Sequence, residues 1–167
     1  KHPEGDVVID GGMPIEVVLD KHKHWGSVVE AYDPVMKASE WCKDVVKTVN
    51  TKPEDVKYVI QTHLHLDHSG AIGHFPNATH ITQKLEYDYA FNPDWFSQPA
   101  YIRADFDKPN IRWKFLQGRK TDFYDVYGDG VIKVIFTPGH TPGHQSVLVN
   151  LPKTGHMLFT GDACYTG

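Results

Sequence analysis

Short apolar runs, separated by Gly, Pro and Asn, recur along most of the chain. Runs of this length and composition, bounded by turn residues, are typical of β-strands. Strands and helical segments that mix in this way favour a layered α/β domain with polar residues at the strand ends. The predicted strands are Asp6–Ile9, Tyr58–Gln61, Thr79–Thr82, Val131–Phe136, Gln145–Asn150 and Met157–Thr160.

The segment Ser39–Asn50 has the spacing of an amphipathic helix. Trp41, Val45 and Val49 recur every four residues, which places them on one side of a helix. The pattern therefore predicts that these three residues form the apolar face of that helix.

The remaining segments have weaker patterns. Thr51 and Glu54 are spaced as a capping box, with a proline in the first turn. Lys84–Phe91 is predicted to be helical. Met13–Pro34 has no clear period and is predicted to form loops, whereas residues 91–117 are rich in aromatics and prolines and carry no assignment.

Composition and charge narrow the class of protein. The 167 residues are 40% hydrophobic and 23% charged, which suits a globular domain with a core of its own. The net charge of -4 gives no general attraction to nucleic acid or acidic membranes. No apolar run approaches the roughly 20 residues that cross a bilayer, and no signal-peptide pattern opens the chain. Cys42 and Cys164 make no disulfide framework, which favours the reducing cytoplasm.

Both ends of the chain predict an internal fragment of a longer domain. The chain opens at Lys1 without a methionine, just before a predicted strand. It stops at Gly167, just after another predicted strand has delivered polar residues to a loop. We therefore expect one partial domain over residues 1–167.

The sequence THLHLDHSG, Thr62–Gly70, comes directly after a predicted apolar strand. It contains three histidines and an aspartate within six residues. On an extended backbone His63 and His65 point to the same side, because side chains alternate with period two. Asp67 and His68 can turn back toward the same space once the strand has ended. Imidazole and carboxylate groups are suitable ligands for divalent transition metals. A tetrahedral ion with one bound water needs three protein ligands, and His68 is a fourth candidate. The motif therefore indicates two ions.

Two further strand ends carry residues of the same kind. His140 follows one strand on the turn TPGHTPGH, and Asp162 follows another. Taken singly, His140 could be a turn residue, Asp162 a helix N-cap, and the other histidines surface residues. Taken together, they favour a binuclear site in which Asp162 bridges ions roughly 3.5–4 Å apart that activate one water as hydroxide.

The other histidines and the second cysteine are predicted to have structural roles. His144 is expected to orient the turn by a hydrogen bond or to support a ligand. Cys164 is expected to be a small buried residue, because metal-hydroxide chemistry needs no thiol. Surface or packing roles are predicted for His24, His74, His80 and His156.

Six residues of this chain together resemble the metal-ligand set of the metallo-β-lactamase superfamily. They are His63, His65, Asp67, His68, His140 and Asp162. VIDGG, at Val8–Gly12, resembles the early strand and turn of that superfamily. HLHLDHSGAIGHFPNATHI, TPGHTPGHQS and DACYT resemble the N-acyl-homoserine lactonases. HWG, YAFNPDWF, YIRADFDKP and YDVYGDG resemble the branch that includes the γ-butyrolactone-cleaving enzyme of plant-associated bacteria. The similarity runs across nearly the whole chain.

The resemblance implies an αββα sandwich, here a hydrolase domain incomplete at both ends, with two divalent ions at one edge of its sheets. It implies that His63, His65 and His140 hold one ion. It also implies that Asp67 and His68 hold the other and that Asp162 bridges the two. A seventh ligand, a histidine, is expected beyond Gly167. Zinc is the expected metal, although nitrogen and oxygen donors also suit iron, manganese and cobalt.

The resemblance implies a lactonase, which opens the ring of N-acyl-homoserine lactones, as in quorum quenching, or of γ-butyrolactone. The metal-bridging hydroxide is expected to attack the carbonyl carbon. Tyr165, three residues past Asp162, is implied to touch the substrate and stabilise the oxyanion. Asp67 is expected to carry a proton to the leaving alkoxide. Leu66 stands where some relatives carry an aromatic residue that lines the substrate channel.

Two other functions stay open at this point. The same chemistry would serve a glyoxalase-II-like thioester hydrolase, and the fold could belong to a non-catalytic metal-binding protein. A nuclease is disfavoured by the acidic balance of the chain. The expected partner is therefore a small lactone, without nucleic acid or membrane. The aromatic segment Tyr87–Phe106 is predicted to line the substrate pocket or to form the contact of a homodimer, with core packing as the alternative.

Overall fold

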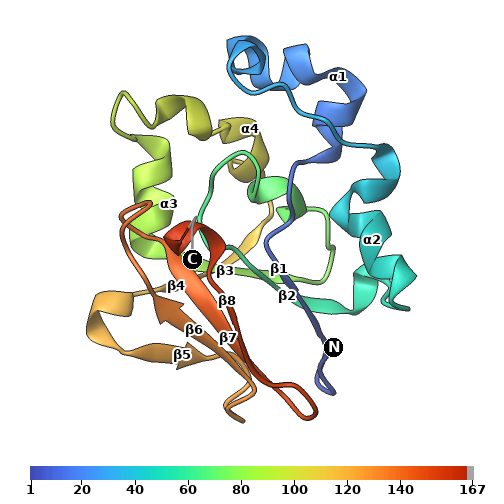
Figure 1. Cartoon of the computed structure of the whole chain (residues 1–167), viewed down its shortest axis with the longest axis vertical. Helices are drawn as coiled ribbons and strands as arrows, with labels where there is room; N and C mark the ends of the chain where they lie inside the picture. Colours follow the sequence, from blue (N-terminus) through green and yellow to red (C-terminus); the bar gives the residue numbers. More distant parts are fainter. Residues whose placement is uncertain (165–167) are drawn as a thin grey trace.

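Two four-stranded sheets form the centre of the protein in a computed structural model that describes residues 1–164 (Figure 1). The first sheet is parallel, and its strands pair in chain order. They are β1 (Asp6–Ile9), β2 (Val56–Ile60), β3 (Thr79–Gln83) and β4 (Arg112–Leu116). The second sheet is antiparallel and also pairs in chain order. It holds β5 (Phe123–Asp125), β6 (Ile132–Phe136), β7 (Gln145–Leu151) and β8 (Gly155–Phe159).

The helices belong to the connections of the first sheet. The α-helices are α1 (Ile15–Trp25), α2 (Cys42–Thr48), α3 (Lys84–Phe91) and α4 (Arg103–Phe106). Short 3-10 turns lie between them: η1 (Gly26–Glu30), η2 (Ala38–Glu40), η3 (Pro53–Asp55), η4 (Ser69–Ala71) and η5 (Gln98–Ala100). Two more follow β4 and β8, namely η6 (Gly118–Lys120) and η7 (Gly161–Ala163).

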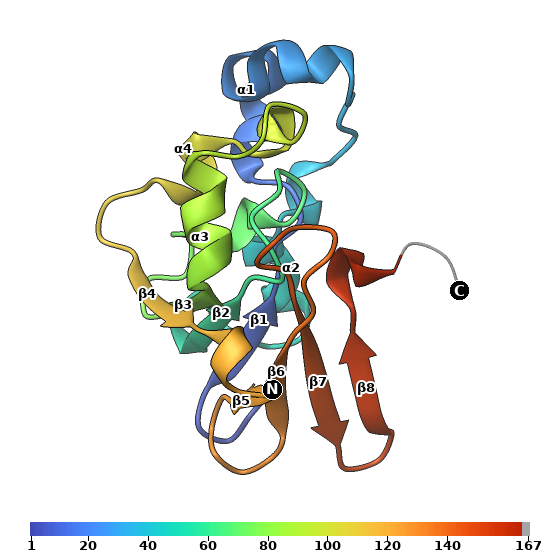
Figure 2. The same ribbon diagram turned by 90° about the vertical axis from the view of Figure 1, so that its left-hand side faces the viewer.

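The apolar core lies on both faces of the parallel sheet. Between the two sheets, Ile60 and Ile81 pack against Val134 and Val147. On the other face, β2 residues pack under α2, and a separate cluster around Leu64 packs under α3 and α4. Burial on both faces explains the continuous apolar runs of these strands. The result is three layers, helices on sheet on sheet, as Figure 2 shows from the side.

The layering confirms the predicted α/β class. Residues 1–164 contain three layers of the expected αββα sandwich. The edge strand β8 exposes Met157, Leu158 and Phe159, whose side chains alternate between its two faces. Within residues 1–164, no helix is long and apolar enough to span a membrane.

The predicted strands and the helix Lys84–Phe91 are confirmed with shifts of two residues or fewer, but Met13–Pro34 is not a loop. It forms α1 and η1. Its apolar residues show no helical period because Val17 is buried while Leu19, two residues later, is 76% exposed. Asp20, which has φ -162° and ψ 90°, interrupts the helix.

The predicted apolar face of Ser39–Asn50 is also wrong. The helix covers Cys42–Thr48, and Val45 and Val49 are exposed. Cys42 and Val46 instead pack against the core under β2. The capping box is wrong too, because the Thr51 hydroxyl donates to Asp6 Oδ2 (2.5 Å) and the turn after it begins at Pro53 without a side-chain cap.

The strands β4 and β5 carry no clear signal in the sequence. Each lies at an edge of its sheet, where one side of the strand is not paired. β4 reads RWKFL and alternates little, because its first and fourth residues are both exposed. A strand at a sheet edge is less constrained to an apolar pattern than a central one.

The segments that leave β1, β2, β6 and β8 meet at one end of the two sheets. The Asp10 N–H donates to Ile60 O (2.8 Å), and the Gln145 N–H donates to Thr62 O (2.9 Å). The carboxyl ends of parallel strands form the usual ligand-binding edge of α/β sheets. The predicted metal ligands all lie on these segments.

Candidate metal centre

The chain that leaves β2 is fixed by the aspartate that follows β1. The N–H and the hydroxyl of Thr62 donate to the two carboxylate oxygens of Asp10, at 2.7 and 2.8 Å. Asp10 has φ 53°, a left-handed conformation that aspartate tolerates better than most residues. The turn after it is tied down as well, since the Gly11 N–H donates to His68 O (2.8 Å).

Three histidines from two segments form the first group of candidate ligands. His63, His65 and His140 each offer a nitrogen, and these nitrogens lie within 4.8 Å of one another. The ring centroids of His63 and His65 are 4.5 Å apart, and each lies 4.8 Å from the His140 ring. His63 and His65 therefore share one space, as their spacing predicts.

A second group shares His63 and adds His68 and Asp162, again within 4.8 Å. Asp162 lies between the groups. Its Oδ1 is 3.3 Å from His68 Nε2, and its Oδ2 is 3.4 Å from His140 Nε2. A carboxylate with one oxygen toward each group has the geometry of a bridging ligand.

The donor atoms fit divalent metal ions. The Nε2 atoms of His63 and His65 are buried and have no hydrogen-bond partner within the part of the chain that the structure describes. A buried polar atom without a partner is costly, and a metal ion would satisfy both nitrogens. Burial lowers the pKa of His65 to about 3 and lowers those of His63 and His140. These imidazoles are therefore neutral near pH 7, the form that binds metals.

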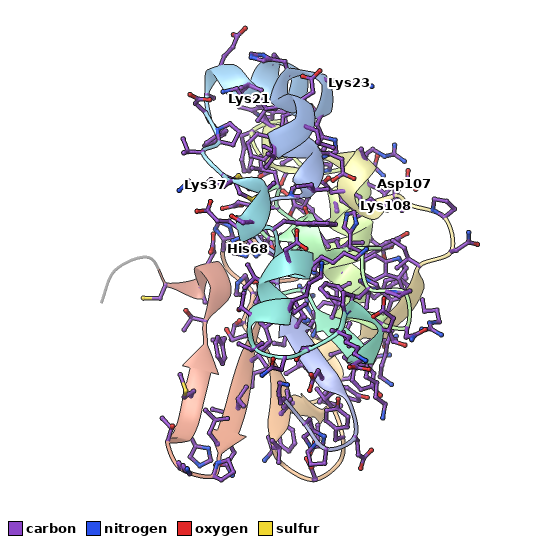
Figure 3. The ribbon with its side chains drawn as sticks, turned by 90° about the vertical axis from the view of Figure 1, so that its right-hand side faces the viewer. Lys21, Lys23, Lys37, His68, Asp107 and Lys108 are labelled. Atoms are coloured by element: carbon purple, nitrogen blue, oxygen red, sulfur yellow. The ribbon has the colours of Figure 1, made fainter. Side chains whose placement is uncertain are left out.

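His68 differs from the other three histidines. Burial opposes its charging, but the hydrogen bond from its Nδ1 to Asp10 Oδ2 (2.9 Å) and the charges of Asp10, Asp67 and Asp162 raise its pKa. A carboxylate on the far nitrogen orients a ligand histidine and leaves Nε2 for the metal. Figure 3 places His68 between the strands below and the helical end of the molecule, where Lys21 and Lys23 lie on α1.

Asp67 lies at the margin of this cluster. One of its carboxylate oxygens is 3.7 Å from His68 Nε2, but the side chain is 58% exposed and it belongs to neither group of three. Its predicted roles as ligand and proton carrier stay predictions. Tyr165, the predicted substrate contact, lies outside the described residues.

His144 is confirmed as a hydrogen-bonding residue behind the centre. Its ring is fully buried, and its Nε2 accepts the backbone N–H of Asp162 (3.1 Å). Its Nδ1 lies 3.1 Å from Thr137 O and 2.9 Å from the Thr137 hydroxyl. His144 thus connects the turn of His140 to the segment that carries Asp162.

Cys164 contradicts its prediction, because it is exposed. The apolar run before it belongs to the exposed strand β8 and does not continue into the core. The histidines with predicted surface or packing roles have such roles. His156 is exposed, His80 is buried and accepts the Gly73 N–H (3.1 Å), His74 packs on Trp41, and His24 contacts Asp105.

Two acidic residues that position the candidate ligands, Asp10 and Glu86, were not predicted from the sequence. Asp10 carried a usable signal, because it directly follows a strand whose end lies beside that of β2. Glu86 carried none. It is fully buried on α3 and accepts hydrogen bonds from Leu64 and Thr141, partners that lie 22 and 55 residues away along the chain.

A pocket of about 420 Å³ opens onto the metal centre. His65, Asp67, His140 and Asp162 form its polar floor. The opposite wall comes from α1 and the chain on either side of it, with Leu66 and Ala100 beside it. The residues from this part of the chain are Met13, Trp25, Tyr32, Asp33 and Pro34. The predicted wall, Tyr87–Phe106, contributes Ala100 alone among the described lining residues, because Tyr87, Phe91, Tyr101 and Phe106 pack in the core.

Comparisons with known proteins agree on the family and the fold. A family model described as the metallo-β-lactamase superfamily matches residues 1–167. The N-acyl homoserine lactonase AttM of Azorhizobium caulinodans is 58% identical over 165 residues, which are 99% of this chain and 63% of that protein. The N-acyl homoserine lactonase of a Bacillus species is 36% identical over 164 residues, 98% of this chain and 61% of that protein.

A solved structure has a similar fold. It is an N-acyl homoserine lactone hydrolase with its product, N-hexanoyl-L-homoserine, bound at the catalytic metal centre. The TM-score is 0.82 at 32% identity, and the match covers 99% of this chain and 62% of the other. The chain thus spans a little under two thirds of the length of the relatives that it matches.

Proposed function

Because the chain belongs to the metallo-β-lactamase superfamily, we propose that it forms the greater part of a lactonase that opens the ring of N-acyl homoserine lactones. The observation that carries this proposal is the pocket. Its floor holds candidate metal ligands, and its wall is largely apolar. A lactone ring needs the first surface and an acyl chain needs the second. The identity of 58% to an N-acyl homoserine lactonase supports the same substrate class.

We assign one ion to His63, His65 and His140, and a second to His68 and Asp67, with Asp162 between them. The two groups of donors that share His63 support this division. Asp67 is the least supported ligand, since it is the most exposed of the six. Zinc is the proposed metal, because imidazole and carboxylate donors suit it, and the donors also accommodate iron, manganese or cobalt.

When bound, two divalent ions supply an activated water and a Lewis acid for the ester carbonyl. The protein's residues would do the rest. Asp67, on the pocket floor beside His68, would take up a proton and pass it to the ring oxygen as the acyl C–O bond breaks. Tyr165 would donate a hydrogen bond to the carbonyl oxygen, where negative charge develops. Leu66 and Trp25 would exclude water from the acyl side of the pocket.

The pocket also discriminates between the rival substrates. A bare γ-butyrolactone ring would leave the apolar wall of Met13, Trp25 and Leu66 uncovered, whereas an acyl chain would bury it. A thioester of glutathione carries carboxylates, and no Lys or Arg is present among the described residues that line the pocket. The apolar wall and the lack of Lys and Arg among the described lining residues both support acyl-homoserine lactones as substrates.

The proposal is tested with the complete, metal-loaded protein and a panel of substrates. Ring opening releases a proton, so a pH indicator follows it for γ-butyrolactone, for homoserine lactones with short and long acyl chains, and for S-lactoylglutathione. We expect the highest kcat/KM for an acyl-homoserine lactone. Preference for the thioester, or metal binding with no turnover of any substrate, would contradict the proposal in favour of the thioesterase or the non-catalytic alternative.

We further propose a cytoplasmic location and a homodimer. The two widely spaced cysteines support the first. Trp95 and Phe96, 84% and 66% exposed on the loop after α3, support the second as a contact surface. A monomeric mass in solution would exclude the dimer.

A further inference from the structure

Glu86 is a buried carboxylate in the first turn of α3, outside the two groups of candidate ligands. Four groups donate hydrogen bonds to it. Three of them come from the two segments that carry the first three histidines, and the fourth is the hydroxyl of Tyr101. A buried carboxylate is expensive unless each lone pair is satisfied, so a residue of this kind marks a position at which apolar packing would not suffice.

One carboxylate oxygen of Glu86 faces the segment after β2. Oε1 accepts the backbone N–H of Leu64 (3.0 Å) and the hydroxyl of Tyr101 (3.1 Å). Leu64 lies between His63 and His65, so this bond fixes the backbone from which both imidazoles project. The Tyr101 ring packs edge-on against His65, with centroids 4.6 Å apart. Glu86 therefore constrains His65 through its backbone and through its ring.

The other oxygen faces the turn of His140. Oε2 accepts the hydroxyl of Thr141 (2.5 Å), and the backbone N–H of Gly143 also donates to the Glu86 carboxylate. A Cβ at Gly143 would collide with the Glu86 backbone, so the turn lies directly against the first turn of α3. Glu86 is thus the point at which the His140 turn is attached to the helix.

We propose that Glu86 is a positioning residue that holds His65 and His140 at the spacing required for one metal ion. The two rings already lie together, with His65 Nδ1 3.0 Å from His140 Nε2. Other bonds between the two segments, from the N–H and the side-chain amide of Gln145 to Thr62 O and Gln61 O, lie nearer the strands than His65 and His140 do. The inference rests on the proposed metal centre but not on the substrate.

The test replaces Glu86 by an amide of the same shape. In Glu86→Gln one oxygen becomes an N–H₂ group, which faces the donors of either Leu64 or Gly143 and cannot accept their protons. We expect the affinity for the ion of the three histidines to fall about 10- to 100-fold, as is typical when a hydrogen bond behind a metal ligand is lost. The ion held by His68 should be affected much less.

Titration of the complete, metal-free protein with Co²⁺ measures this effect, because the visible spectrum reports the ligand geometry and needs no turnover. Asp88→Asn is the matched control, since Asp88 lies on the same helix, is exposed and pairs only with Lys84 among the described residues. The control should bind two ions with the wild-type spectrum and affinities. A Glu86→Gln variant with unchanged affinities and spectrum would overturn the proposal.

Two further variants keep the test decisive if Glu86→Gln does not fold. Tyr101→Phe and Thr141→Val each remove one hydroxyl that donates to Glu86 and leave the carboxylate in place. Each should weaken the same ion by a smaller factor and change the Co²⁺ spectrum, and unchanged binding in both would refute the proposal. A wild-type protein that binds two ions but opens no lactone would refute the proposed function and leave the role of Glu86 standing on the metal data.

Discussion

The two sides of the pocket are built in different ways. The residues of the floor lie on the segments 62–68 and 137–144 and at Asp162, and hydrogen bonds to Asp10, Glu86 and His144 hold these segments. The wall, residues 13–34, is held mainly by apolar contacts of Val17, Trp25 and Val29 with Leu66. A metal centre needs ligands fixed to a fraction of an ångström, whereas an acyl chain needs only a surface of adequate size. Metal binding and chain-length preference should therefore respond to different substitutions.

The largest expected effect comes from the residue that joins the two groups on the floor. Asp162→Ala removes the oxygens that face His68 and His140. We expect loss of at least one metal ion and a fall in kcat/KM on the order of 10³-fold, since electrostatic stabilisation of the transition state is lost with it. Metal content by mass spectrometry and lactone hydrolysis give the two readouts.

Asp122→Ala serves as the control, because Asp122 is exposed and far along the chain from every ligand. It should keep both ions and full activity. Full metal content and activity in Asp162→Ala would contradict the assignment of two ions.

The second prediction tests whether the hydrogen bonds to the candidate ligand segments contribute to metal affinity. Asp10→Asn keeps a residue that tolerates φ 53° but converts one acceptor oxygen into a donor. Either Thr62 or His68 then loses its partner. We expect metal affinity to fall about 10- to 100-fold with the fold retained, which isothermal titration and circular dichroism would measure.

Asp122→Asn makes the same chemical change at an exposed position and should bind metal like the wild type. If Asp10→Asn bound both ions with unchanged affinity, the hydrogen bonds of Asp10 would not fix the floor, and the contrast with the wall would rest on Glu86 and His144 alone.

The same contrast decides what could be predicted from the sequence. The candidate ligands of the floor were predictable because His63, His65 and His68 lie within six residues of one another just after a strand, and local spacing is visible in a sequence. Asp10 acts on partners 52 and 58 residues away, and Glu86 acts on partners 15, 22 and 55 residues away. Their roles therefore depend on which segments the fold brings together.

The wall could not be predicted for a different reason. Its helix α1 buries Val17 and Trp25, eight residues apart, while Leu19 faces solvent. A short helix that packs through a few residues, with an interruption at Asp20, has no clear apolar stripe. The more aromatic segment Tyr87–Phe106 has the composition of a pocket wall or a subunit contact, but most of its aromatic side chains pack in the core, which was the alternative.

A third, smaller effect tests the wall. Tyr32→Ala removes a pocket-lining side chain that is 57% exposed, so the fold should survive. We expect kcat/KM for long-chain homoserine lactones to fall about 10-fold, with little change for short chains, because only a long chain reaches this surface. Trp95→Ala is the control, an exposed aromatic residue outside the pocket. If chain-length preference changed in Trp95→Ala and not in Tyr32→Ala, the acyl chain would contact residues 87–106 and not residues 13–34.

The smallest effect concerns the polar contact that fastens the wall to the floor. His24 Nε2 on α1 lies 2.6 Å from Oδ1 of the fully buried Asp105, whose Oδ2 accepts the hydroxyl of Ser69, next to His68. The hydrogen bond to Asp105 outweighs burial and raises the pKa of His24 above its ordinary value. A raised folded-state pKa stabilises the protein fully below the unfolded pKa of about 6.5, and this stabilisation is lost as the pH rises through the folded value.

The free energy of unfolding should therefore fall between pH 6 and pH 8.5 by more in the wild type than in His24→Gln. Because His24 is partly solvated, we expect a difference below about 1 kcal/mol. Urea unfolding at the two pH values measures it, and His156→Gln, at an exposed histidine of β8, controls for a general loss of histidine charge. An equal pH dependence in wild type and His24→Gln would mean that apolar packing alone holds the wall. In that case the wall would be joined to the floor through apolar contacts such as those of Leu66, and substitutions along α1 should change chain-length preference more than metal affinity.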